Sequence, residues 1–65
     1  MSRKHFVALA AIFAGDLAGC RTEGERNKVR GIVLSTADLG YQSNAFFDRA
    51  KFYAASGLTA DGMLR

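Results

Sequence analysis

Proline and tryptophan are missing from this sequence of 65 residues, and cysteine and histidine each occur only once. A single cysteine cannot form a disulfide within the chain, and one cysteine with one histidine cannot complete a four-ligand zinc site. Disulfides and metals are the usual means of stabilising so small a domain, whose core alone contributes about 3–5 kcal/mol. These absences point to oligomerisation or a binding partner as the remaining source of stability.

Candidate catalytic residues are equally scarce. His5 stands beside two basic residues, and Cys20 has no histidine or second cysteine near it in the sequence. A helix through residues 2–19 would hold these two side chains at opposite ends, so they cannot form a cysteine–histidine pair. Cys20 is then expected to be a small buried hydrophobe, and glycine-rich phosphate loops after a strand are missing. We predict a protein that is not an enzyme and holds no metal or cofactor.

Hydrophobic residues make up 49% of the chain, which is too many for a disordered protein. The absence of proline and the abundance of alanine favour helices. The net charge of +3 is spread along the chain, with acidic residues between the basic ones. A dedicated nucleic-acid-binding domain usually concentrates its positive charge more than this. The composition therefore predicts a small all-α domain with a mildly basic surface.

The first predicted helix covers about residues 2–19. Ser2 can cap its start, and Met1 and Phe6 stand at the positions of a hydrophobic staple. Apolar side chains recur at helical spacing along one stripe, which predicts the buried face of this helix. The residues of the stripe are Phe6, Leu9, Ala10, Phe13, Leu17 and Cys20.

The second predicted helix covers about residues 23–40. Thr22 and Glu25 form a capping box, in which each side chain accepts a hydrogen bond from the backbone N–H of the other residue. Gly40 can end the helix in a left-handed conformation. The side chains expected to face the first helix across the core are Val29, Ile32, Val33 and Leu39. The apolar stripe on which they lie also includes Thr36, with Leu39 and Ala37 at its margins.

A short third helix covers about residues 49–56 and has clear signals at both ends. Asp48 can cap its start by accepting a hydrogen bond from the backbone N–H of Lys51. Gly57 can take the left-handed conformation just past its end. Two apolar contacts complete the pattern, namely a staple between Phe47 and Phe52 and a Schellman contact between Tyr53 and Leu58.

Together these segments predict an all-α fold, in which the two longer helices form an antiparallel hairpin closed by the third. The domain is expected to span residues 1–58. Residues 59–65 have no hydrophobic periodicity, so we expect a C-terminal tail that is mobile or folds against a neighbour. Phe46 and Phe47 are adjacent in the connection before the third helix, so we expect one of the two rings to point to the core and the other to the loop. Tyr41 is expected to cover the core.

The side of the first helix opposite the apolar stripe carries small residues. Ala11, Gly15 and Gly19 recur every four residues, and Ile12 lies beside them. Such a surface allows a second helix to approach closely, and each glycine inside a helix costs about 1 kcal/mol relative to alanine. We interpret Ala11, Ile12, Gly15 and Gly19 as a candidate interface. The alternative interpretation is that alanine and glycine simply fill an exposed helix surface.

DNA binding through a helix-turn-helix is the alternative function. The second and third helices have the right order for this motif. However, the connection between them is longer than the usual turn of about three or four residues, and the third helix has no Asn or Gln among its first residues for base readout. A solvated basic face explains the charges more simply. Under the DNA-binding alternative the contacts would come from Arg26, Lys28, Arg30, Arg49 and Lys51.

A bacterial lipoprotein is a lesser alternative. The basic residues at the start could be the n-region of a signal peptide, and Leu17-Ala18-Gly19-Cys20 matches a lipobox. Against this, Asp16 places a charge within the segment that should be apolar, and residues 20–65 alone are too few to build a core. The segment is also too short and too interrupted by charge to span a membrane. Membrane association is therefore expected only if Cys20 is lipidated.

Both ends of the chain resemble a widespread group of small phage and prophage proteins. The opening Ser2-Arg3-Lys4-His5-Phe6, followed by Ala8-Leu9-Ala10, is similar to their start. Phe47-Asp48-Arg49-Ala50-Lys51-Phe52-Tyr53-Ala54-Ala55, followed by Gly57, is similar to their C-terminal signature. The group has no assigned activity, so the resemblance implies a setting, the bacterial cytoplasm, and no chemistry. The functional hypothesis is a non-enzymatic phage accessory protein that binds itself or a host protein, for example as an inhibitor.

Overall fold

The computed structural model describes residues 3–65, which form three helices. α1 spans Arg3–Gly19, α2 spans Glu23–Ser43 and α3 spans Arg49–Ala55. Residues 3–65 contain no strand, so the predicted all-α fold is confirmed over this range. The predicted cap at Ser2 and its staple at Met1 lie outside the described residues.

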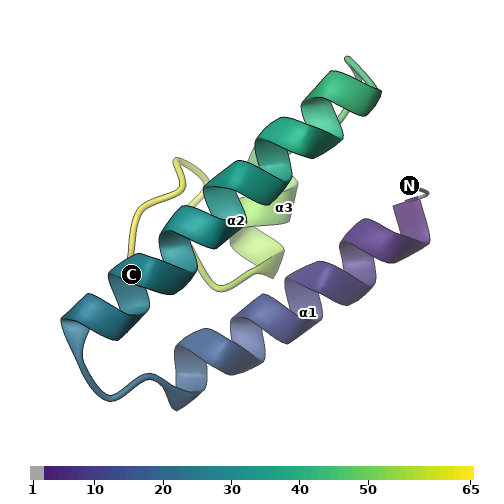
Figure 1. The fold of residues 1–65 in the computed structure, drawn as a ribbon. Coiled ribbons are helices and arrows are strands. Elements are labelled where there is room, and N and C mark those ends of the chain that lie inside the picture. Colours follow the sequence, from purple (N-terminus) through teal and green to yellow (C-terminus); the bar gives the residue numbers. More distant parts are fainter. Residues whose placement is uncertain (1–2) are drawn as a thin grey trace.

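The two longer helices run antiparallel, and α3 packs against both of them (Figure 1). α3 and the segment that follows it lie on the same side of the pair, so the opposite side of the hairpin is left open. The start of α1 and the end of α2 form one end of the hairpin, which we call the open end. The predicted hairpin closed by a short third helix is therefore confirmed.

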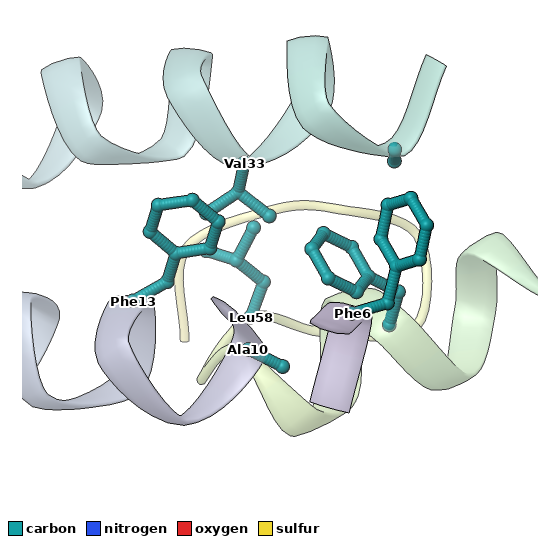
Figure 2. Packing of buried hydrophobic residues seen from close by; sticks show 7 residues of the cluster. Phe6, Ala10, Phe13, Val33 and Leu58 are labelled. Carbon is teal, nitrogen blue, oxygen red and sulfur yellow. The ribbon is translucent and has the colours of Figure 1, made fainter. Parts of the chain in front are cut away.

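The core forms where α1 meets α2, α3 and the segment after α3. Phe6, Ala10 and Phe13 of α1 are buried, as the apolar stripe predicted. Figure 2 shows Phe6 and Phe13 pointing from α1 toward α2, with Leu58 beside Val33. Val33 and Leu58 are fully buried. The partly buried side chains around this cluster are Leu9, Leu17, Val29, Phe47, Tyr53 and Leu64.

Two of the residues predicted to face the core from α2 do not. Ile32 is 50% exposed and Leu39 is 51% exposed, whereas Val33 and Ala37 are buried. The reason is that α2 contacts both α1 and α3. Its buried arc therefore centres on Val33 and Ala37, between the two neighbours, and the predicted stripe was centred too far to one side.

α2 also runs to Ser43, beyond its predicted end at Gly40. The cap residue is Asn44, whose backbone N–H donates a hydrogen bond of 3.0 Å to the carbonyl oxygen of Gly40. Gly40 is buried, and a Cβ atom at this position would lie 2.9 Å from the ring of Phe47. The glycine is thus needed for close packing inside the helix, and it does not end the helix.

The predicted signals at both ends of α3 are confirmed. The carboxylate of Asp48 accepts a hydrogen bond of 3.1 Å from the backbone N–H of Lys51. Gly57 has a φ of 93°, in the left-handed region. The backbone N–H of Leu58 donates to the carbonyl oxygen of Tyr53 over 2.9 Å, which is the long bond of a Schellman motif.

The other helix ends differ from the prediction in small ways. Thr22 accepts the backbone N–H of Glu25 over 3.1 Å as expected, but the carboxylate of Glu25 accepts the N–H of Arg21, not that of Thr22. α3 ends one residue earlier than predicted, at Ala55. Its C-cap, Ser56, is fully buried and donates its hydroxyl to the carbonyl oxygen of Phe52 over 2.7 Å.

Four phenylalanine rings from α1, α3 and the loop between α2 and α3 pack against one another. The ring of Phe6 lies 4.7 Å from that of Phe47 and 5.9 Å from that of Phe52, measured between centroids. Phe47 and Phe52 are 5.6 Å apart, which confirms the predicted staple. Phe13 meets Phe52 edge-on at 6.3 Å. These tilted and edge-to-face arrangements are the ones aromatic pairs favour.

The C-terminal segment packs against α2, so the packed unit extends beyond Leu58. The guanidinium Nε of Arg30 donates to the carbonyl oxygen of Gly62 over 2.6 Å, and the backbone N–H of Thr59 donates to the carbonyl oxygen of Met63 over 2.9 Å. Leu64 adds an apolar contact with the core. The mobility predicted for residues 59–65 stays a prediction.

Candidate protein-binding surface

The outer face of α1 is the candidate interface identified from the sequence, and it is open to solvent. Ala11, Gly15 and Gly19 are exposed, and Ile12 is 57% exposed. A Cβ atom added at Gly15 or at Gly19 would meet no atom within 4 Å apart from the backbone of its own helix. The structure therefore places all four residues on the surface, with space for another chain to approach the helix backbone.

α1 carries few polar groups for a helix that lies at the surface. Its 17 residues include only three charged side chains, those of Arg3, Lys4 and Asp16, together with the exposed His5. A surface helix normally has a charged or polar face opposite its apolar stripe, whereas a helix that is apolar all round is normally buried. The outer face of α1 has the character of a contact surface.

A groove lies at the open end of the hairpin, and the sequence did not reveal it. Its volume is about 540 Å³, and its walls come from the start of α1, the end of α2, the loop after α2 and one side of α3. Phe6 and Phe47 supply aromatic surface, and Val7, which is 64% exposed, lies on its α1 side. The groove is thus mainly apolar and continues toward the outer face of α1 through Val7.

Phe46 stands at this groove with its side chain 93% exposed. The loop makes adjacent side chains diverge, because Asn44 holds two successive backbone N–H groups: its side-chain oxygen accepts that of Phe46 over 3.0 Å, and its carbonyl oxygen accepts that of Phe47 over 2.9 Å. Phe47 enters the aromatic cluster while Phe46 points outward. This agrees with the expectation that only one of the two rings would reach the core.

Some of the five basic residues considered for DNA binding already contact other groups of this chain. Arg49 pairs with Asp38 at 3.0 Å and stacks over the ring of Tyr41 at 4.5 Å. Tyr41 is 47% exposed beneath this guanidinium, so its predicted role as a cover for the core is wrong. Arg30 donates to the C-terminal segment, while Lys28 and Lys51 are exposed and Arg26 is half-buried. Two of the five thus already donate to groups of this chain.

Cys20 is half-buried at the end of α1, so the prediction of a buried hydrophobe is only partly right. Its thiol donates to the carbonyl oxygen of Asp16 over 3.1 Å. Within residues 3–65, no group of three His, Cys, Asp or Glu side chains is placed to hold a metal ion. Cys20 therefore has the contacts of a helix-terminal residue.

Comparison of this chain with models of protein families, with curated proteins and with solved structures finds no match. None of the three described helices is long and apolar enough to cross a lipid bilayer. The argument for function consequently rests on the surface of the molecule itself, and above all on the outer face of α1, Phe46 and the groove beside it.

The sequence contained only a partial signal for this groove. Its walls come from segments far apart in the chain, which no periodicity within one helix brings together. The signal that the sequence did contain is the pair of adjacent rings, Phe46 and Phe47. The staple with Phe52 needs only Phe47, so the pattern gave Phe46 no place in the core.

Proposed function

We propose that this protein is a small non-enzymatic protein that acts by binding another protein chain. The observation that carries the proposal is the exposure of apolar surface on α1, where Val7 and Ile12 are more than half exposed and Gly15 and Gly19 leave the backbone open. Removing such surface from water favours association, and small residues allow close helix packing. The setting we propose, from the resemblance of both ends of the chain, is a phage or prophage, with the binding partner either a second copy or a host protein.

A matched pair of glycine substitutions tests this proposal. Gly15→Gln places a long side chain on the outer face of α1, and Gly31→Gln does the same on α2. Apart from the backbone of its own helix, neither position has an atom within 4 Å of the new Cβ, so we expect both variants to keep the fold. Both gain helix propensity and are expected to be more stable than the wild type by up to about 1 kcal/mol.

The readout is complex formation, measured by size-exclusion chromatography with light scattering for self-association and by capture from a bacterial lysate for host proteins. We expect Gly15→Gln to weaken the complex at least about tenfold, because the new side chain holds the partner helix away, and Gly31→Gln to bind like the wild type. Wild-type protein that forms no complex in either assay contradicts the proposal. Binding unaffected by Gly15→Gln places the contact elsewhere.

A further inference from the structure

Phe46 and the groove beside it make one self-complementary surface. The ring is 93% exposed, more than any other large apolar side chain in the described part of the chain. The groove next to it is walled by Phe6, Val7 and Phe47, and its volume of about 540 Å³ falls within the usual range for binding sites, about 300–1,000 Å³. This chain therefore presents an aromatic side chain and a mainly apolar recess for one, side by side.

The charges around the groove also suit a second copy of the same chain. Arg3 and Lys51 supply positive charge at its walls, and Asp48 supplies negative charge. In a two-fold symmetric dimer the same patch meets itself, so a patch that carries both signs of charge can pair opposite charges across the axis. A groove with charges of one sign would instead select a partner of the opposite charge.

We propose that the partner is a second copy of this chain, and that each Phe46 ring enters the groove of the other copy across a two-fold axis. This inference rests on the proposed protein-binding function and names the partner. Because Phe46 is the side chain that fills the partner's groove, it is expected to dominate the affinity, as buried aromatic anchors do.

Sedimentation equilibrium of single variants tests the role of the ring. We expect Phe46→Ser to weaken the dimer about thirty-fold or more. The thermal stability of the monomer, measured below the concentration at which the chain associates, should stay unchanged, because the ring makes little contact within its own chain. The control is Ile32→Ser, which removes a half-exposed apolar side chain outside the groove and should leave the dimer intact.

Mixing two variants tests whether the ring enters the groove. Phe46→Ser removes the ring, which is one of the groove's lining residues, but keeps the other aromatic walls at Phe6 and Phe47. Val7→Arg obstructs the groove but keeps the ring. A mixed dimer regains one of its two docking contacts, so the mixture should associate about tenfold more tightly than either variant alone. If the mixture is no tighter, the ring does not dock in the groove and the inference is overturned.

Two further outcomes separate this inference from the proposed function. A dimer that is weakened by Gly15→Gln and not by Phe46→Ser overturns the role of Phe46 and leaves protein binding through α1 in place. A wild-type chain that stays monomeric up to about 1 mM overturns the proposed self-association. In that case the capture of host proteins with the two glycine variants tests the proposed protein-binding function independently.

Discussion

At the scale of single residues, the fold depends on which side chains find room between the helices. Phe46 and Phe47 are neighbours with the same side chain, yet Phe47 packs against Phe6 and Phe52 while Phe46 is almost fully exposed. The turn at Asn44 causes the difference, because it fixes the backbone so that successive side chains diverge. Identical residues thus have opposite roles, one in the core and one at the surface.

Phe52 is expected to be the most sensitive position in the chain. Its ring is 5% exposed and lies within 6.3 Å of three other phenylalanine rings. Phe52→Ala should cost about 3–5 kcal/mol, which equals the whole stability expected of so small a core. Circular dichroism of this variant at 25 °C should show a largely unfolded chain.

The control for this substitution is Phe46→Ala, which should change the free energy of unfolding by less than about 0.5 kcal/mol when measured below the concentration at which the chain associates. A Phe52→Ala variant that melts within a few degrees of the wild type would show that the aromatic cluster does not hold the helices together.

At the scale of the element, α2 shows how tertiary contacts change the use of a residue. Glycine near the end of an apolar pattern favours a helix C-terminus, but α2 continues through Gly40 for another three residues. Glycine suits this position inside the helix because of packing. With no side chain at Gly40, the ring of Phe47 can lie against the helix backbone. α3 behaves differently, since its caps are satisfied by residues next to it in the sequence and its ends were predicted closely.

Alanine substitution at two glycines of α2 should therefore have opposite effects. Gly40→Ala puts a methyl group 2.9 Å from the ring of Phe47 and should destabilise the protein by about 1–3 kcal/mol. Gly31→Ala meets no atom within 4 Å and should stabilise it by up to about 1 kcal/mol through helix propensity. Urea unfolding of both variants measures the difference, and equal stabilisation by both would disprove the close contact.

At the scale of the whole molecule, the C-terminal segment adds to the core on the same side of the helix pair as α3. Residues 59–65 contribute the partly buried Leu64 and the carbonyl group that Arg30 binds. Gly62 is buried and has a φ of 82°, a left-handed conformation that lets the chain turn back toward α2. The molecule thus supplements a small core with its own tail, while the outer face of α1 stays uncovered.

Two neighbouring substitutions distinguish a packed tail from a mobile one. Leu64→Ala should lower the free energy of unfolding by about 1 kcal/mol, because its side chain is partly buried against the core. Met63→Ala, at a residue that is 54% exposed, should have less than half that effect. Urea unfolding measures both, and two neutral variants would support the mobile tail that the sequence predicted.

The sequence by itself determined the local structure of this protein. Apolar spacing set the buried face of α1, and the residues flanking α3 set both of its ends, because helix periodicity and capping depend on neighbours within a few positions. The tertiary structure decided which arc of α2 is buried, that Gly40 stays inside the helix, and that the segment after Leu58 packs on α2. It also decided the candidate site, because the groove beside Phe46 is built from segments far apart in the chain. Such a recess exists only once the helices have packed, and no local pattern encodes it.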